Sequence, residues 1–254
     1  MKKFILGTCV LVFVLAATGF GQSNNDDWKG FYIGANLGGA FGNSHAQTST
    51  ILPSDYFQDT SVPVVNGAGD RHLDLNGFTG GGQIGYNARF GTTLLFGVEA
   101  DFGSLKLDET TSATGEYPCC AGNFFTVGQR VNTNWLFTAR PRVGVTMGKA
   151  LIYGTAGLAM TKVKFSQLFT DTFDALEFGD NSATKAGWAA GGGVEFKLAS
   201  HWSAKGEYLY AGFGDESHSS TNLTQGGSSF PGSIFTQTVN LHSNMVRAGL
   251  NYRF

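Results

Sequence analysis

The last ten residues of the chain alternate between apolar and polar side chains without interruption. One face carries Val246, Ala248, Leu250, Tyr252 and Phe254, and the other carries Met245, Arg247, Gly249, Asn251 and Arg253. A period of two is that of a β-strand, here with one apolar and one polar, charged side. Because this strand stands at the end of the chain and finishes on an aromatic residue, we expect it to close a barrel.

The composition also favours strands. Hydrophobic residues make up 42% of the chain, charged residues 14%, and the net charge is −2. These values exclude a disordered chain and a basic nucleic-acid-binding protein. Glycine occurs 37 times in 254 residues, about twice its usual share of ~7%. Enrichment in glycine and aromatic residues favours strands whose backbones approach closely.

The first residues have the three parts of a secretory signal peptide. Lys2 and Lys3 are followed by an apolar run over 4–17 and then by small residues. The run contains 14 residues, fewer than the ~20 that span a bilayer as a helix. We therefore predict export without a helical anchor, and three segments: a signal peptide over 1–21, a periplasmic segment over 22–30 and a barrel over 31–254.

The chain without this signal peptide retains two cysteines, Cys119 and Cys120, which are adjacent. Adjacent cysteines rarely form a bridge, because the small ring that they close is strained. We expect an unbridged pair in a loop, without a structural, redox or metal-binding role.

Alternation with a period of two predicts eight strands. They are Phe31–Gly42, Gly77–Phe90, Leu94–Leu105, Asn134–Met147, Ala150–Phe165, Lys185–Leu198, Trp202–Phe213 and Leu241–Phe254. All exceed the ~5–6 residues of a soluble strand and reach the ~9–11 residues that cross a bilayer at a tilt. The connections alternate between long polar stretches and tight turns. The long ones are 43–76, 106–133, 166–184 and 214–240, and the tight ones are 91–93, 148–149 and 199–201.

This pattern is typical of barrels in the bacterial outer membrane, whose long loops face outside. The predicted fold class is all-β: a transmembrane, eight-stranded, antiparallel, up-and-down β-barrel with four long extracellular loops and three short periplasmic turns. A soluble secreted β-sandwich is the alternative, because its strands alternate too. For the fifth predicted strand the lipid-facing side stays ambiguous, since it could carry either Leu151 and Tyr153 or Ile152, Ala156 and Leu158.

Charged side chains fall on one face of the predicted strands. A charge at the lipid-facing midplane costs roughly 2–4 kcal/mol, so a barrel must turn its charges inward. We predict a charge network in the lumen, in which Glu99 and Asp101 pair with Arg140 and Arg142. Its members are Arg89, Glu99, Asp101, Arg140, Arg142, Glu195, Lys197, Lys205, Glu207, Arg247 and Arg253.

Aromatic residues mark both ends of the apolar face, as two girdles do at the borders of a lipid-facing band. One predicted girdle holds Phe31, Tyr86, Phe90, Phe96, Phe196, Trp202, Tyr252 and Phe254. The other holds Phe41, Phe78, Phe102, Trp135, Phe137, Trp188 and Tyr210. A soluble core does not require this arrangement, so the girdles favour the membrane barrel.

Several segments of the chain resemble the porin-family, OmpA-like eight-stranded barrels of alpha-proteobacteria, often called outer-membrane immunogenic proteins. The resemblance rests on Trp28-Lys29-Gly30-Phe31-Tyr32-Ile33-Gly34, on Gly77-Phe78, on Phe96-Gly97-Val98-Glu99 and on the terminal Arg247-Ala248-Gly249-Leu250-Asn251-Tyr252-Arg253-Phe254. It covers nearly all of the chain after the signal peptide. It implies a location in the bacterial outer membrane after signal-directed export, and no specific activity.

The same resemblance implies that the outer-membrane assembly machinery recognises the terminal strand. The residues of this assembly signal are Val246, Leu250, Tyr252 and Phe254. The chain departs from the common pattern in its long first loop, its cysteine pair and Pro141 within the fourth predicted strand. A proline removes a ladder hydrogen bond, so we expect a local irregularity at Pro141.

Eight strands enclose a space that side chains can fill, whereas aqueous channels need about twice as many strands. We therefore predict an interior plugged by paired charges, in a structural and surface protein that supports envelope integrity. A narrow porin for small solutes is one alternative. A haemin-binding or adhesive barrel is another, because the resemblance extends to proteins with those properties.

The predicted loops carry 13 acidic residues against two basic ones, Arg71 and Arg130, if Lys106 is counted with the outer end of its strand. Aromatic residues are interleaved with these acids: Tyr56, Phe57, Phe124, Phe125, Phe169, Phe173, Phe230 and Phe235. The pattern indicates either a solvated anionic rim or a surface that contacts a ligand.

We expect no enzyme. His242-Ser243-Asn244 is similar to the active-site strand of lipid A deacylases, but adjacent residues point to opposite faces and this strand has no acidic residue. His45, His72, His201 and His218 show no metal-ligand spacing. We predict no catalytic residue, cofactor or metal. The expected partners are outer-membrane lipid and lipopolysaccharide, the assembly machinery, periplasmic chaperones, and a host or haem ligand at the loops, without nucleic acid.

Overall fold

The computed structural model describes residues 28–254. The predicted signal peptide, 1–21, and residues 22–27 of the predicted periplasmic segment lie outside the described residues. Within 28–254, no helix has the length and apolar character needed to cross a membrane.

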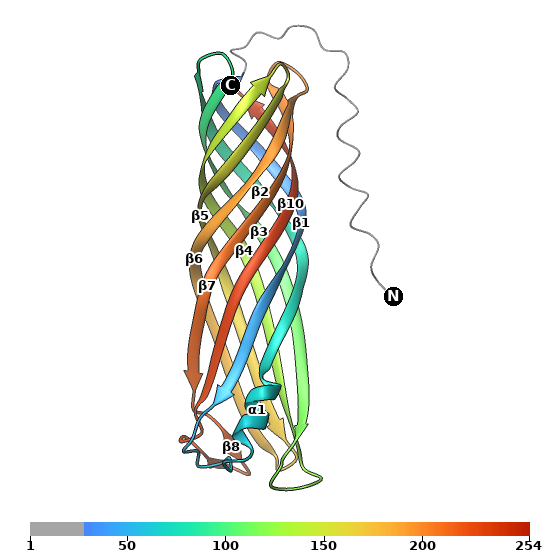
Figure 1. Ribbon diagram of the computed structural model, residues 1–254, viewed down its shortest axis with the longest axis vertical. Helices are drawn as coiled ribbons and strands as arrows, with labels where there is room; N and C mark the ends of the chain where they lie inside the picture. The colour runs from blue at the N-terminus through green and yellow to red at the C-terminus, as the bar shows by residue number, and fades with distance from the viewer. Residues whose placement is uncertain (1–27) are drawn as a thin grey trace, which may run out of the picture.

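Eight long strands form a closed antiparallel barrel (Figure 1). They are β1 (Gly30–Thr50), β2 (Asp70–Phe90), β3 (Leu94–Glu116), β4 (Phe124–Met147), β5 (Ala150–Asp171), β6 (Ala175–Lys197), β7 (Trp202–Ser220) and β10 (Phe235–Arg253). The strands pair in the order β5-β4-β3-β2-β1-β10-β7-β6, and pairing of β5 with β6 closes the ring. The short strands β8 (Thr224–Gln225) and β9 (Ser228–Ser229) and the helix α1 (Val62–Ala68) complete the fold. The predicted all-β antiparallel barrel is confirmed.

The strands are far longer than the sequence indicated. They contain 19 to 24 residues. With ~3.3 Å per residue and a tilt of ~40°, the barrel is roughly 50 Å tall, about twice the ~25 Å apolar band of an outer-membrane barrel. The prediction of four long loops is wrong, because most of those polar residues continue the strands. The connections at that end are 51–69, 117–123, 172–174 and 221–234.

The two faces of the wall exchange character halfway along the barrel. On β1 the outward residues are apolar up to Phe41 and polar from Asn43 onward. On β2 the inward residues change from Thr79 to Leu75, again at mid-strand. We call the half with the apolar outer face the turn half and the half with the apolar inner face the cap half. Strands with polar residues outward were mistaken for loops, since the prediction required apolar residues outward.

Helix α1 closes the cap end from inside (Figure 1). Its residues Val62, Val65 and Ala68 are buried in an aromatic cluster between the strands. The side chain of Asn66 holds the helix to β1, because it accepts a hydrogen bond from Thr50 N (2.8 Å) and donates one to Thr50 O (3.1 Å). The first predicted loop is therefore an internal plug and not an external excursion.

The wall has a seam between β6 and β7. Their backbones pair from Lys197–Ser203 up to Gly187–Phe213, and the ladder stops there. Further toward the cap end, side chains bridge the strands: Lys185 Nζ donates to Asp215 O (2.8 Å), and Asn222 Nδ2 donates to Phe178 O (2.7 Å). At the very end β8 pairs with Ala175 and Leu176 of β6. Along this seam the barrel is closed by side chains and not by a backbone ladder.

The structure confirms one expectation and settles an ambiguity. The ladder of β4 with β5 is interrupted at Pro141: pairing ends at Ala139–Leu158 and resumes at Arg142–Thr155, with residues 140 and 141 unpaired to β5. The irregularity is local, because the register is the same on both sides of this gap, and a register shift occurs elsewhere, between Thr133 and Leu136. On β5, Leu151 and Tyr153 are buried, so Ile152 and Leu158 form its exposed apolar face.

The seam predicts uneven hydrogen exchange along one strand. Over 178–186, every second backbone amide of β6 points toward β7, with which this part of β6 forms no backbone ladder. We expect the fastest of these amides to exchange at least about ten-fold faster than those over 187–197, since exchange follows local opening. Residue-level hydrogen exchange on the refolded barrel measures this, with the cap half of β5 as control. Uniform protection along β6 would contradict a seam.

Candidate functional site

The inward residues of β10 show how the barrel interior is layered. From the turn end they run through Arg253 and Arg247, then Met245, then Gln237, and finally Phe235. Equivalent positions on the other strands give a tryptophan layer, a charge network, an apolar layer, a thin polar layer and an aromatic cap. Each layer is built by residues from several strands, so the interior is filled over the whole height of the barrel.

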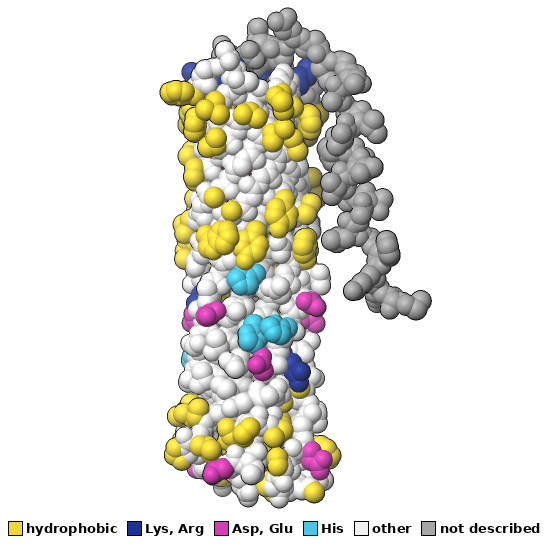
Figure 2. Space-filling view, in the orientation of Figure 1, with side chains coloured by type: hydrophobic (Ala, Val, Ile, Leu, Met, Phe, Trp, Pro, Cys, Tyr) yellow, Lys and Arg dark blue, Asp and Glu magenta, His cyan; other side chains and the backbone are white. Residues whose placement is uncertain are grey.

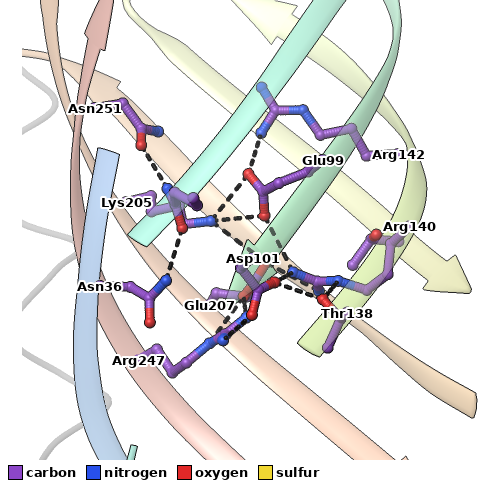
Figure 3. A network of polar contacts seen from close by, with 12 residues as sticks. Asn36, Glu99, Asp101, Thr138, Arg140, Arg142, Lys205, Glu207, Arg247 and Asn251 are labelled. Atoms are coloured by element: carbon purple, nitrogen blue, oxygen red, sulfur yellow. Dashed lines mark hydrogen bonds and ion pairs between the residues drawn. The ribbon is translucent and has the colours of Figure 1, made fainter. Parts of the chain in front are cut away.

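The charge network occupies the turn half (Figure 3). Arg140 is its centre: Nη2 lies 3.1 Å from Glu99 Oε1 and 2.9 Å from Asp101 Oδ2, and Nη1 lies 3.4 Å from Glu207 Oε1. Arg142 Nη1 lies 3.5 Å from Glu99 Oε2. Both arginines of β4 therefore face the two carboxylates of β3 with which they were predicted to pair.

The remaining members extend the network around the ring. Lys205 Nζ lies 2.9 Å from Glu99 Oε1, and Arg247 lies 3.1 Å from Asp101 Oδ1 and also pairs with Glu207. Glu195 receives Arg142 and Arg253, each at 3.4 Å. The four carboxylates and their five cationic partners are almost fully buried. Burial without such partners would cost several kcal/mol per charge, so the network must act as a unit.

Inward glycines make room for aromatic rings and not for water. A Cβ on Gly85 would lie 2.2 Å from the hydroxyl of Tyr32, which donates a 2.7 Å hydrogen bond to Glu99. A Cβ on Gly193 would lie 2.7 Å from the hydroxyl of Tyr153. The guanidinium of Arg142 lies between these two rings, 4.7 and 5.1 Å from their centres. The glycine-rich rows thus belong to the plug.

Trp28 forms the tryptophan layer at the turn end, and the sequence prediction missed it. Its side chain is 1% exposed, and its backbone oxygen accepts a hydrogen bond from Asn87 Nδ2 (3.1 Å). The cations of Lys197 and Arg253 lie 5.1 and 4.8 Å from the Trp28 ring. Arg89, at the same end, donates to the backbone oxygen of Thr92. The sequence held one indication of this layer: a tryptophan just before the first strand, in a chain whose predicted lumen holds more cations than acids.

The apolar layer lies directly beyond the charges, where β3 turns Leu105 and Leu107 inward. Leu73, Leu75, Phe165 and Phe213 are among the buried residues that meet them from other strands. Water and ions cross a packed apolar layer only at high cost. This layer therefore separates the charge network from the cap end.

The thin polar layer is formed by glutamines and one carboxylate. Gln237 Nε2 donates to Gln167 Oε1 (3.2 Å) and to Ser220 Oγ (2.9 Å), and Ser220 in turn donates to Glu177. Gln129 Nε2 donates to the backbone oxygen of Gly69, the residue that follows α1 (2.8 Å). Burial raises the pKa of Glu177 above its ordinary value, and the Ser220 hydrogen bond opposes this.

The aromatic cap lies outside the polar layer and corrects the prediction for the loop aromatics. Phe57, Phe125, Phe169 and Phe235 are 0 to 5% exposed and pack against one another. They form a core because the strands continue to this height and leave an interior to fill. Phe124 and Phe173 are exposed, and Tyr56 and Phe230 pack on the edge of the cap.

Two phenols meet one carboxylate in the aromatic cap. Tyr56 and Tyr117 both donate to Asp171 Oδ2, at 2.6 and 2.9 Å. Burial, and then the hydrogen bond to Asp171, raises the pKa of both phenols well above their ordinary values. Both therefore stay neutral donors, and they tie the connections 51–69 and 117–123 to the end of β5.

Cys119 and Cys120 form a disulfide, so the expectation of an unbridged pair is wrong. They lie in a tight turn in which Cys120 N donates to Tyr117 O (3.2 Å) and Asn123 N donates to Cys120 O (3.1 Å). The turn packs on the aromatic cap. The backbone of the turn thus holds the adjacent side chains together, which sequence spacing alone does not reveal.

The histidines do not form a metal site or a catalytic pair. The His45 and His72 rings stack at 4.5 Å on the outer wall of the cap half, where Asp70 accepts from His45 (2.6 Å). Within residues 28–254, no group of three or more His, Cys, Asp or Glu side chains is placed to hold a metal ion. His242 faces outward and bonds Tyr210, whereas Ser243 is buried on the opposite face.

The outer wall of the turn half carries two bands of hydrophobic side chains (Figure 2). The band at the turn end includes Phe31, Phe90, Trp202 and Phe254, and the band near mid-height includes Phe41, Phe78, Phe102 and Trp188, all exposed. Val246, Leu250, Tyr252 and Phe254, the predicted assembly signal, lie on this outer face, where Tyr252 packs between Trp202 and Phe254. Their recognition by an assembly machinery stays a prediction.

A closed antiparallel barrel with charges inside and two aromatic bands outside defines an outer-membrane β-barrel. The model of the outer membrane protein beta-barrel domain family matches residues 8–254, and the chain belongs to this family. It is a protein of the bacterial outer membrane, as the resemblance predicted.

Two sequence relatives are also named as outer-membrane proteins. The 31 kDa outer-membrane immunogenic protein of Brucella melitensis is 35% identical over 89% of this chain and 84% of its own. The 22 kDa outer membrane protein of Rhizobium leguminosarum bv. viciae is 33% identical over 57% of this chain and 58% of its own. Among solved structures, the outer membrane protein OprG from Pseudomonas aeruginosa is 13% identical, with a TM-score of 0.46, over 89% of this chain and 97% of that one.

The charge network predicts an asymmetric response to charge removal. Glu207→Gln leaves Arg140, Lys205 and Arg247 short of a shared partner, so we expect a loss of ~3–5 kcal/mol in the free energy of unfolding. Asp108→Asn removes the exposed partner of Arg130 and should change stability far less, because water screens that pair. Denaturant titration of both variants refolded in lipid vesicles checks this. Equal losses would contradict a cooperative network.

Proposed function

We propose that this protein is a non-conducting surface stalk of the outer membrane. The turn half spans the bilayer, and the cap half stands in water outside the cell. The observation that carries this proposal is the exchange of the two wall faces at mid-height. The apolar outer face lies in the turn half, where lipid would cover it, and the cap half turns most of its apolar residues inward as a water-soluble protein does.

The filled interior supports a structural role over a porin. A solute would have to pass Trp28, a ring of nine paired charges, a packed apolar layer and the aromatic cap. The charge network also favours a structural role over a catalytic one, because its nine buried charges pair with one another. We infer that the barrel contributes to envelope integrity by packing with outer-membrane lipid and lipopolysaccharide.

The tip of the cap half supports a second role in surface contact. Leu168, Leu176 and Phe178 lie on the outer face of β5 and β6 and are 45 to 50% exposed, although no lipid reaches this height. Leu168 and Phe178 face each other across the strands, and Phe124 and Phe173 are exposed on the neighbouring connections. Contiguous apolar side chains in water mark interaction sites. We infer that this patch, the tip patch, contacts a host or other protein partner.

Conductance measurements test the stalk. We expect the refolded chain to give no stepwise current in planar bilayers, and Trp28→Ala to stay silent too, because the apolar layer remains. A large porin added to the same membrane shows that channels are detectable. Heat-dependent migration in detergent gels shows that the barrel is folded. Regular current steps from folded protein would overturn the proposed function in favour of a narrow porin.

Substitution of the tip patch tests the contact role. Leu168→Ser with Phe178→Ser should lower adherence of cells that display the protein by several-fold, because the apolar contact is lost. Ser182→Ala with Thr184→Ala, on the same outer face of β6, is the matched control and should leave adherence unchanged. Haemin titration of the same proteins tests the alternative ligand. Unchanged adherence at equal surface levels would refute a role of the tip patch.

A further inference from the structure

Three lysines gather on one side of the outer wall. Lys106 lies on β3, and Lys162 and Lys164 lie on β5. Alternation fixes their direction, because the residues on either side of each are buried inside the barrel. These inward neighbours are Leu105, Leu107, Thr161, Val163 and Phe165. The lysine cluster therefore projects outward from β3 and β5, which β4 separates.

The lysine cluster begins where the apolar band ends. Lys106 is the register partner of Phe78 of the mid-height band. Lys162 follows Met160 by two residues, and Met160 pairs with Phe137 of that band. The headgroup layer of a bilayer extends roughly 5–7 Å beyond the hydrocarbon on each side. Lysines at this position place their ammonium groups in that layer while their stems lie along the wall.

These lysines have no carboxylate partner in the part of the chain that the structure describes, since its ion pairs involve other cations. Asp108 on β3, which β4 separates from Lys164, accepts hydrogen bonds from Arg130. Asp180 on β6 accepts a hydrogen bond from Ser166. By contrast, Lys185 at the seam is paired with Glu216. The lysine cluster is thus a local excess of positive charge at headgroup height.

We propose that Lys106, Lys162 and Lys164 bind phosphate groups of lipopolysaccharide, the glycolipid of the outer leaflet. This inference rests on the proposed function, which puts the cap half outside the cell. Ammonium–phosphate contacts are charge-assisted and strong at a partly dehydrated interface. Lys106 and Lys162 are two strand spacings apart, roughly 10 Å, so the cluster engages two phosphates at once. It fixes the height of the barrel in the membrane and gives it a preferred lipid neighbour.

Binding of purified lipopolysaccharide to the refolded barrel in neutral-lipid nanodiscs tests the proposal. We expect Lys106→Gln/Lys162→Gln/Lys164→Gln to weaken binding at least about ten-fold, and dephosphorylated lipopolysaccharide to bind the parent protein equally weakly. Rising salt should lower the parent affinity toward that of the variant. Lys29→Gln/Lys149→Gln, which removes two charges at the turn end, should leave binding unchanged, whereas Lys162→Gln/Lys164→Gln should not.

Several results would overturn the lysine site. They are unchanged binding by the triple variant, equal binding of the dephosphorylated lipid, or full competition by millimolar inorganic phosphate, which would indicate a free anion site. Arginine at all three positions keeps the charge and should keep the affinity, which separates loss of contact from misfolding. Heat-dependent gel migration reports insertion separately. A barrel that inserts without binding the lipid refutes the lysine site and leaves the stalk intact.

Discussion

Each strand of this barrel has only two faces, and the surroundings of the outer face determine which kind of residue the inner face carries. Because successive side chains of a strand point to opposite faces, one alternating pattern sets the residues of both the inner and the outer wall. In the proposed arrangement, lipid surrounds the turn half and accepts apolar side chains but rejects charges. Water surrounds the cap half, where only burial of apolar residues inside can drive folding. The exchange of faces at Asn43 on β1 and at Leu75 on β2 follows from this constraint.

The charge network belongs to the same constraint. A one-residue slip of any strand in the turn half would carry its inward charges into lipid and its outward apolar residues into the lumen. The ionic interior thereby excludes wrong registers more than it adds net stability, since buried ion pairs often only offset their own desolvation. Arg140, which contacts three carboxylates on β3 and β7, couples the register of the two strands that flank the lumen from opposite sides.

The sequence predicted the turn half well, because its pattern of apolar residues outward and charges inward is the one that a lipid-facing barrel requires. The order of its strands and the inward direction of residues such as Glu99 and Arg140 followed from alternation alone. The cap half was mistaken for loops because its pattern is that of a soluble sheet, with polar residues outward and apolar residues inward. Trp28, the buried aromatic cap and α1 depend on contacts between distant segments, which no local period reports. The Cys119–Cys120 disulfide depends on the path of one turn, which spacing does not define.

A filled lumen shifts the sites of function to the outer wall. The five layers leave no path along the axis, so the described part of the chain meets other molecules through its lipid-facing bands, the lysine cluster and the tip patch. These surfaces lie at three heights, and their spacing is fixed by the continuous strands. The seam between β6 and β7 is the exception in this rigid frame, because side chains replace the ladder from Lys185 onward. It runs from the mid-height band almost to the tip, so a partner that docks at the tip patch on β6 also contacts a strand whose cap half has a continuous backbone ladder on one side only.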